Sequence, residues 1–397
     1  MVFDAIVIGA GIVGLSTARH LLKSRSDLKL LILEKEERHA FHQTGRNSGV
    51  IHSGVYYLPG SEKAKHCYAG RKLLEDFCDE HGIAWKRSGK LIVATQQKQL
   101  PQLRELERRA NENGVASRWL AAEEVNDFEP HVASVAALSI PEAGVVNYQE
   151  VCDALVKDLK NRGAELRFGV RVDSCVENSE GLELKSVGEA FATRLMVNCA
   201  GLYSDRVARM FNVKLESQII PFRGEYFALK PEFNSLCKTL IYPVPNPDFP
   251  FLGVHLTRGV DSRVTCGPNA VLAFSREGYK RTDVSFRDLM ETMAYPGFWK
   301  LALGNMGYGL HELWRSFSKA SFVRSLQTLV PEVQAHMLEP YPAGVRAQVV
   351  YESGKLADDF IVKRSAHAVH VINAPSPAAT ASLALGETIG NKALEQI

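Results

Sequence analysis

The chain has 397 residues, of which 46% are hydrophobic and 23% are charged, and its net charge is +2. This length and composition predict a globular protein with two domains, and a net charge so near zero gives no electrostatic reason to expect a nucleic-acid partner. Its seven cysteines are scattered without a C-x-x-C pair, which is typical of a reducing compartment and indicates neither a disulfide framework nor a metal site.

The first elements along the chain are a strand, a glycine turn and a helix. The apolar run 5–8 leads into Gly9, Gly11 and Gly14, the G-x-G-x-x-G spacing that brings a backbone turn and a helix N-terminus to a pyrophosphate. A second apolar strand, 28–33, ends in Glu34, whose carboxylate can accept hydrogen bonds from ribose hydroxyls. Because that carboxylate would repel a 2′-phosphate, the pattern favours NAD or FAD over NADP. The alternative is a glycine turn that binds nothing.

The loop after this unit, residues 42–57, is rich in small and polar residues, which indicates backbone packed closely against a flat or anionic ligand. The later elements alternate between helices and strands. We expect helices over 61–81, 99–113 and 148–162, strands over 89–95, 191–201, 223–229, 251–257 and 367–372, a helix that begins at Ser204–Asp205, and a terminal helix that ends near Leu394.

These elements predict an α/β fold in which a Rossmann-like nucleotide-binding domain is discontinuous in sequence. We expect this domain to comprise residues 1–84, 146–218 and 344–397. Residues 85–145 and 219–343 are expected to form a second domain, the substrate or cap domain, with a mostly antiparallel sheet. The apolar N-terminus contains Asp4 and no basic region, so it predicts no targeting segment, and we expect a cytoplasmic protein.

Longer strings of the sequence resemble the bacterial L-2-hydroxyglutarate dehydrogenases, also called oxidases, within the superfamily of D-amino-acid oxidase and glycerol-3-phosphate dehydrogenase. The resemblance covers almost the whole chain. The strings that carry it are TGRNSGVIHSGVYY at 44–57, PFRGEYF at 221–227, FLGVHLTR at 251–258, GPNAVLAF at 267–274, AGVRAQ at 343–348 and NAPSPAAT at 373–380. The resemblance implies FAD as the cofactor, a substrate-domain sheet that covers the flavin, and oxidation of L-2-hydroxyglutarate to 2-oxoglutarate by hydride transfer from C2 to flavin N5. Electrons would then pass to a quinone of the respiratory chain or to oxygen.

The same resemblance places the loop 42–57 along the isoalloxazine ring and its ribityl chain. The turn 376–380 precedes the terminal helix, whose N-terminus can stabilise negative charge on a reduced flavin. A plain helix cap is the alternative for this turn. The residues expected to bind the cofactor are Gly9, Gly11, Gly14, Glu34, Lys35, Thr44, Gly45, Asn47, Ser48, Val172, Ala200, Gly201, Ser376, Ala378, Ala379 and Thr380.

Arg346 is the strongest candidate for binding a substrate carboxylate. It follows the mainly apolar stretch 341–345, where a guanidinium needs an anionic partner. An internal carboxylate such as Asp358 or Asp359 is the alternative partner. The resemblance implies that Arg346 clamps the carboxylate beside the reacting carbon. A five-carbon diacid needs a second anchor, for which the candidates are Tyr57, Arg223, Tyr242 and Arg258. His255 is also expected to contact the substrate.

His52 and His255 are the candidates for the base that accepts the C2 hydroxyl proton. A structural hydrogen bond is the alternative role for each histidine. Two other functions stay open at this point. One is a related FAD-dependent amine or glycerol-3-phosphate oxidoreductase, and the other is a flavin- or NAD-binding protein without redox turnover.

Residues 285–329 form a candidate contact with the inner face of the cell membrane. Aromatic rings beside cations are what a helix at a lipid interface requires, although core packing is the more common role of such rings. The aromatic residues are Tyr295, Phe298, Trp299, Trp314 and Phe317, and the cations are Lys300, Arg315, Lys319 and Arg324.

Overall fold

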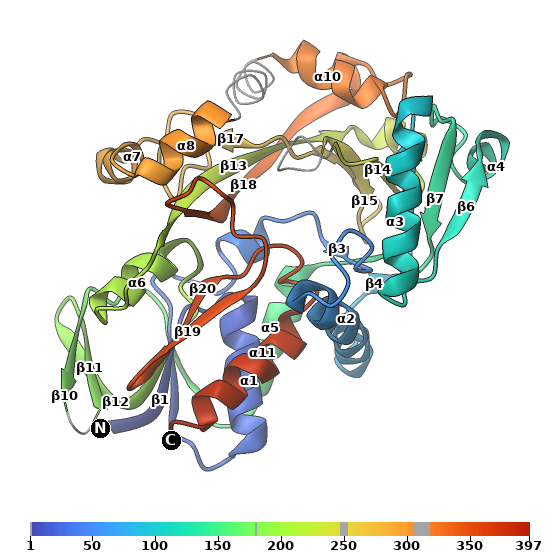
Figure 1. The fold of residues 1–397 in the computed structure, drawn as a ribbon. Helices are drawn as coiled ribbons and strands as arrows, with labels where there is room; N and C mark the ends of the chain where they lie inside the picture. The colour runs from blue at the N-terminus through green and yellow to red at the C-terminus, as the bar shows by residue number, and fades with distance from the viewer. Residues whose placement is uncertain (1, 179–180, 247–252, 305–317) are drawn as a thin grey trace.

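The computed structural model describes residues 2–178, 181–246, 253–304 and 318–397. It has a mixed α/β fold built around two large sheets, drawn in the lower and upper parts of Figure 1. The first sheet has the order β10-β11-β12-β1-β2-β9, with β20 beside β12 and β19 beside β20. Its strands are β1 (Val2–Ile8), β2 (Leu30–Leu33), β9 (Glu165–Arg167), β10 (Ser174–Asn178), β11 (Gly181–Ser186), β12 (Glu189–Asn198), β19 (Ile361–Ser365) and β20 (Ala368–Asn373).

The central strands of this sheet are parallel, because β1 pairs in parallel with both β2 and β12, and β12 pairs in parallel with β20. Apolar side chains of β1 and β2 pack in one buried cluster with those of four helices, α1, α2, α5 and α11, so these helices cover one face of the sheet, whereas α6 packs with the side chains of the other face. Local signals fix where two of these helices begin, since the Ser61 and Asn147 side chains accept backbone N–H groups of α2 and α5. The helices associated with this sheet are α1 (Ile12–Ser24), α2 (Glu62–Glu80), α5 (Tyr148–Asn161), α6 (Ser204–Met210) and α11 (Ser382–Leu394).

The second sheet lies above the first in Figure 1 and has the order β17-β13-β16-β15-β14-β5-β7-β6, with β18 beside β13. Its pairings are antiparallel except that of β14 with β5. Its strands are β5 (Lys90–Ala94), β6 (Arg118–Ala121), β7 (Ala136–Ile140), β13 (Ser217–Leu229), β14 (Leu240–Pro243), β15 (His255–Arg258), β16 (Val264–Gly267), β17 (Val271–Leu272) and β18 (Leu338–Tyr351). The helices beside it are α3 (Leu100–Glu112), α4 (Ala122–Phe128), α7 (Phe286–Met293), α8 (Pro296–Gly304) and α10 (Lys319–Gln327).

A small third sheet joins β3 (Val50–Ile51), β8 (Gly144–Val146) and β4 (Trp85–Lys86). Short 3-10 helices cover Gln43–Gly45, Gln97–Gln99, Gly201–Tyr203, Pro231–Leu236 and Ala335–Met337. The fold class predicted from the sequence is confirmed. The domain boundaries stay a proposal, which is supported by the division of the strands between the two large sheets.

Several local predictions differ from the structure. The loop 42–57 contains a 3-10 turn and β3. The helix α6 begins at Ser204 as expected, but the Ser204 hydroxyl does not cap it and instead donates to the Ile372 carbonyl (3.2 Å). Of the strand expected over 251–257, Phe251 and Leu252 lie outside the described residues, and β15 begins at His255.

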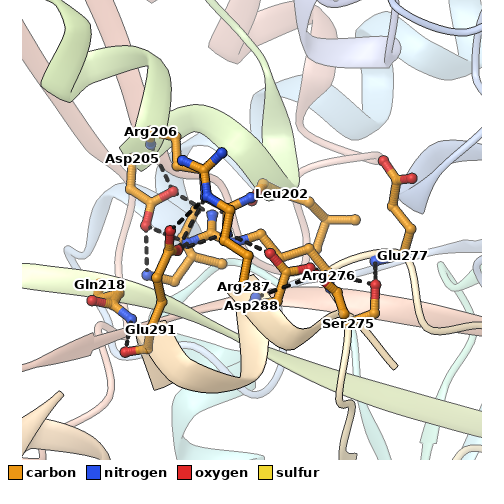
Figure 2. A network of polar contacts seen from close by, with 12 residues as sticks. Leu202, Asp205, Arg206, Gln218, Ser275, Arg276, Glu277, Arg287, Asp288 and Glu291 are labelled. Atoms are coloured by element: carbon orange, nitrogen blue, oxygen red, sulfur yellow. Dashed lines mark hydrogen bonds and ion pairs between the residues drawn. The ribbon is translucent and has the colours of Figure 1, made fainter. Parts of the chain in front are cut away.

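A buried ion-pair network connects α6 with the segment 275–291 beside the second sheet, as Figure 2 shows. Asp205 and Arg276 are each 1% exposed, and the Arg276 guanidinium donates to both carboxylate oxygens of Asp205 and to the Leu202 carbonyl. Arg206 pairs with Asp288 and Glu291 on α7. Burial opposes ionisation of Asp205, but the hydrogen bonds and charge of Arg276 outweigh it and lower the pKa of the carboxyl group.

Candidate active site

A single continuous cavity of about 1250 Å³ lies between the two large sheets. The carboxyl ends of β1, β2 and β12 line one end, as expected for a doubly wound fold. Side chains from the second sheet line the other end, including Tyr226 on β13, Tyr242 on β14, His255 on β15 and Arg346 on β18. The cavity is large enough for a dinucleotide and a small substrate side by side.

The glycine turn lines the nucleotide end of this cavity. Gly9 has φ +103°, and a Cβ there would lie 2.4 Å from the Cys199 carbonyl oxygen, while a Cβ on Gly14 would lie 2.0 Å from the Gly9 carbonyl oxygen. These two glycines are therefore required by the fold itself. A Cβ on Gly11 would meet only the Thr44 hydroxyl, at 3.4 Å. Because Gly11 has no side chain, the cavity has free space beside the N-terminus of α1, which is the place where a pyrophosphate fits.

Glu34 and Lys35 follow β2 and both line the cavity. The Glu34 carboxylate accepts the backbone N–H groups of Ala10 (2.8 Å) and Glu36 (3.0 Å). Since a carboxylate has about four acceptor sites, capacity remains for ribose hydroxyls. The Lys35 ammonium is held by Glu36 and Glu277, so its charge is already balanced within the protein. Val172, Ala200 and Gly201 also line this end of the cavity.

In the loop after β2, some residues face the cavity and others have a structural role. Thr44, Asn47 and Ser48 line the cavity, and the Thr44 hydroxyl also accepts the backbone N–H of Ile12 (3.1 Å). Gly45 does not line the cavity, and a Cβ there would lie 2.3 Å from the Ala40 carbonyl oxygen. Its role in the structure is therefore close backbone packing.

The turn 376–380 also contains both cavity-facing and structural residues. Ser376, Ala378 and Ala379 line the cavity, but Thr380 is fully buried away from it. The Thr380 hydroxyl accepts the backbone N–H of His52 (3.0 Å), which ties this turn to the loop 42–57. The terminal helix begins only at Ser382, and the Ala378 N–H is used inside the turn, where it donates to the Pro375 carbonyl (2.9 Å).

His255 has the hydrogen-bonding pattern of a base. Its Nδ1 lies 2.8 Å from the Gly253 carbonyl oxygen, which can only accept, so Nδ1 carries the proton and Nε2 holds a lone pair. Burial lowers the pKa of His255 to about 3, and the charges of Lys90 and Arg346 also lower it. The imidazole is therefore neutral at neutral pH, with the lone pair on Nε2.

His52 lines the cavity as well, and its Nε2 lies 3.4 Å from the Ser376 hydroxyl. Burial is the main cause that holds its pKa well below the ordinary histidine value, and the charge of Lys90 and the proximity of His255 add to the effect. Both candidate histidines thus reach the same cavity in the neutral form. Only His255 has a protein acceptor that fixes its tautomer among the contacts described here.

Arg346 lines the cavity from β18 and forms a side-chain hydrogen bond with Tyr226, which also lines it. The two internal carboxylates considered as alternative partners are engaged elsewhere. Asp358 pairs with Lys63 (2.9 Å), and Asp359 accepts the backbone N–H groups of Glu62 and Lys63. Tyr226 is a residue that sequence reasoning missed, and its position at the bulge of β13 opposite β18 gave no local signal.

Of the four candidates for a second anchor, Tyr242 alone is among the residues that line the cavity. Arg223 pairs with Glu225 (3.1 Å), and Arg258 donates to the carbonyls of Asn234 and Cys237. The Tyr57 hydroxyl is hydrogen-bonded to Ser376. The structure therefore does not bring Arg223, Arg258 and Tyr57 into the cavity.

The fold and this cavity define an FAD-dependent oxidoreductase. The family described as FAD dependent oxidoreductase matches residues 4–391. The chain is 46% identical to an L-2-hydroxyglutarate dehydrogenase of Indibacter alkaliphilus, with all of both chains covered, and 42% identical to that of Escherichia coli K12, with 98% of this chain and 93% of the relative covered. The chain belongs to the L-2-hydroxyglutarate dehydrogenases of the FAD-dependent oxidoreductase family.

Solved structures agree on the fold. L-α-glycerophosphate oxidase from Mycoplasma pneumoniae with FAD bound superposes with a TM-score of 0.80 at 20% identity, covering 100% of this chain and 94% of that one. Glycine oxidase from Geobacillus kaustophilus gives 0.73 at 18% identity, covering 100% and 95%. The FAD cofactor predicted from the sequence is confirmed by the family.

Proposed function

We propose that this chain oxidises the C2 alcohol of L-2-hydroxyglutarate to the ketone of 2-oxoglutarate. The observation that carries the proposal is the position of His255 and Arg346 on one wall of the cavity whose other end holds the glycine turn and Glu34. A guanidinium recognises a carboxylate, and a neutral imidazole accepts a hydroxyl proton. A 2-hydroxy acid presents these two groups on adjacent carbons.

Bound FAD supplies the acceptor for the hydride that leaves C2. The protein residues act on the rest of the substrate. Arg346 binds the C1 carboxylate with two N–H groups and fixes the orientation of C2. His255 Nε2 accepts the proton of the C2 hydroxyl, while the Gly253 carbonyl holds the ring in the required tautomer (2.8 Å). The buried setting excludes water and keeps the imidazole unprotonated.

Anaerobic reduction of the flavin tests this proposal. The holoenzyme should lose its yellow colour with L-2-hydroxyglutarate and yield 2-oxoglutarate. The D enantiomer, glycerol 3-phosphate and L-amino acids serve as the comparison panel. Faster bleaching with glycerol 3-phosphate or an amino acid would refute the substrate assignment, and a protein that binds FAD but is bleached by none of them would refute turnover.

We further propose that the reduced enzyme meets a lipid-soluble quinone at a membrane surface formed by α7 and α8. None of the described helices is long and apolar enough to span a bilayer. Five large apolar side chains are nevertheless exposed here, and they are Val284 (61%), Phe286 (77%), Met290 (49%), Trp299 (49%) and Leu303 (68%). Exposed apolar groups next to Arg287 and Lys300 suit an anionic lipid surface.

Part of the segment expected to contact lipid has another role. Phe298 is buried, and the ammonium of the exposed Lys319 donates to the Leu338 carbonyl (2.9 Å), so the ring packs inside the protein and the charge is held by the backbone. Trp314, Arg315 and Phe317 lie outside the described residues. Flotation with anionic liposomes tests the surface. A Phe286→Glu/Trp299→Glu variant that floats as well as the wild type, or a wild type that stays with the soluble fraction at low salt, would exclude it.

A further inference from the structure

Lys90 is a buried lysine whose ammonium lacks a hydrogen-bond acceptor among the described residues. The residue is 1% exposed and is the first residue of β5. Its Nζ lies 4.1 Å from the ring centre of Tyr242 and 5.3 Å from that of Tyr56. Contact with aromatic rings offsets only part of the cost of removing an ammonium group from water. Such a buried cation is expected to meet an anion that is absent from the protein alone.

The strand pairing places this ammonium beside the catalytic end of the cavity. β14 lies between β15 and β5, and the ring of Tyr242 on β14 stacks on that of His255 on β15 with centres 3.8 Å apart. Because His255 covers one face of the Tyr242 ring, the Lys90 ammonium lies over the other face. His255, Tyr242 and Lys90 therefore form a row across three neighbouring strands of the second sheet.

Arg346 lies on the far side of His255 from Lys90. From β18 the sheet continues through β13, β16, β15 and β14 to β5. Arg346 and His255 line the same cavity, and the charges of both Lys90 and Arg346 lower the pKa of His255. The sheet thus offers, in order, a guanidinium, a base and an ammonium.

We propose that Lys90 binds the distal carboxylate of the substrate and makes the site selective for dicarboxylates over monocarboxylates. This inference rests on the proposed function, because it takes the C1 carboxylate at Arg346 and the C2 hydroxyl at His255 as given. The remaining carbons then extend along Tyr242, which lines the cavity, toward Lys90, which is not itself a lining residue and whose ammonium lies directly behind the Tyr242 ring, 4.1 Å from its centre. A 2-hydroxy dicarboxylate carries a carboxylate, a hydroxyl group and a second carboxylate in this order, and the sheet carries Arg346, His255 and Lys90 in the matching order.

The other cations near this end have protein partners. Lys63 lines the cavity but pairs with Asp358 (2.9 Å), and Arg223 pairs with Glu225 (3.1 Å). Arg258 is held by two backbone carbonyls. Carboxylates thus already balance the charges of Lys63 and Arg223, and backbone carbonyls hold Arg258, whereas the contacts described for Lys90 are with ring faces.

Lys90 is also the group in this cluster that changes charge near neutral pH. Burial lowers the pKa of Lys90 to about 7. The groups that face it come from the loop 42–57, α2, β14 and β15. Burial raises the pKa of Tyr56, Cys67 and Tyr242 and lowers the pKa of His52 and His255, so these five groups stay neutral. Loss of the Lys90 charge as the pH rises through 7 should therefore weaken dicarboxylate binding to the free enzyme.

Comparing two substrates tests the proposal. L-2-hydroxypentanoate has the same chain length as L-2-hydroxyglutarate and carries a methyl group in place of the distal carboxylate. The quantity to measure is the ratio of kcat/KM for the dicarboxylate to kcat/KM for the monocarboxylate, on FAD-loaded enzyme. In Lys90→Met, which keeps the length of the side chain without its charge, we expect this ratio to fall about 100-fold, as for loss of one partner of a buried charge pair.

Lys63→Met is the matched control, because Lys63 also lines the cavity but is paired with Asp358. Its ratio should stay within about threefold of the wild-type ratio, as expected for removal of a partly exposed ion pair. Equal losses on both substrates in Lys90→Met would show a structural role only, and a larger change in Lys63→Met would assign the distal carboxylate to Lys63. Either result overturns the proposal.

A second measurement begins with the wild-type enzyme. The wild-type ratio should decline as the pH rises from 6 to 8, across the pKa of about 7 for Lys90, and Lys90→Arg, whose charge persists at high pH, should remove the decline. A wild-type ratio that does not change with pH refutes the proposal even where Lys90→Met fails to fold. Failure of the wild type to oxidise L-2-hydroxyglutarate would instead refute the proposed function.

Discussion

The buried pair of Arg276 and Asp205 gives a sharp prediction of stability. Replacing Arg276 with Met removes both side-chain donors to a carboxylate that is 1% exposed. The backbone N–H groups of Arg206 (2.8 Å) and Ile219 (3.2 Å) remain as its donors, and the half-exposed Arg209 guanidinium remains at 3.6 Å. Two charge-assisted hydrogen bonds contribute about 1.5–3 kcal/mol each, so we expect the free energy of unfolding to fall by about 3–5 kcal/mol, the usual cost of removing one partner of a buried ion pair.

The loss should be specific to this buried pair. Arg287 in the same network donates to Glu291 (3.1 Å), but its side chain is 74% exposed, so Arg287→Met should cost under about 1 kcal/mol. Urea denaturation of the FAD-loaded proteins, followed by circular dichroism, compares the two midpoints. The double variant Arg276→Met/Asp205→Leu should recover most of the stability, because it leaves no unpaired charge. Equal midpoints for the Arg276 and Arg287 single variants would refute the reasoning.

Three further predictions concern the cofactor, the base and pH. Gly11→Val should purify without FAD because its side chain fills the open wall beside α1, whereas Gly304→Ala, where a Cβ meets nothing within 4 Å, should keep its flavin absorbance; a yellow Gly11→Val protein would contradict this. His255→Ala should slow anaerobic flavin reduction by about 10²–10⁴-fold, and stopped-flow rates should show a smaller loss for His52→Ala; the reverse order would make His52 the base. Because the folded-state pKa of Asp205 is lowered, its contribution to stability is present above the ordinary value of about 3.9 and is lost as the pH falls through the lowered pKa. Acid unfolding of Asp205→Asn should therefore show a weaker pH dependence than that of the wild type, and equal curves would argue against the shift.

The nucleotide end of the site could be predicted from the sequence because its signals are local. The glycine turn and Glu34 are separated by one helix, and their spacing alone places them at the carboxyl edge of neighbouring parallel strands. The same short range made the helix predictions accurate to a few residues, whereas β13 begins at Ser217, before the residue 223 at which its strand was predicted to start. Gly45 shows the limit of such reasoning, since its neighbour Thr44 faces the cavity while Gly45 packs against the Ala40 backbone.

The substrate end could be predicted only in part, because it depends on the pairing of distant strands. Arg346 could be recognised because it is an arginine that follows an apolar stretch. Arg258 lies on β15, the strand of the cavity residue His255, yet its guanidinium donates to two backbone carbonyls outside the cavity. Lys90 begins an apolar strand, and its position there carries no sign of proximity to His255. That proximity arises because β14 joins β5 in parallel and β15 in antiparallel pairing.

This arrangement also connects selectivity with catalysis. Each cation that would bind a substrate carboxylate lowers the pKa of His255, and therefore keeps the base free of a proton while the site waits for substrate. A dicarboxylate that neutralises both cations would remove that effect and raise the basicity of the imidazole next to the hydroxyl it must deprotonate. A monocarboxylate would neutralise one cation only. On this reasoning the distal carboxylate should increase the rate of flavin reduction as well as the affinity, so that L-2-hydroxypentanoate at saturation should reduce the flavin more slowly than L-2-hydroxyglutarate does. Equal limiting rates in stopped-flow measurements would restrict the role of the distal carboxylate to binding.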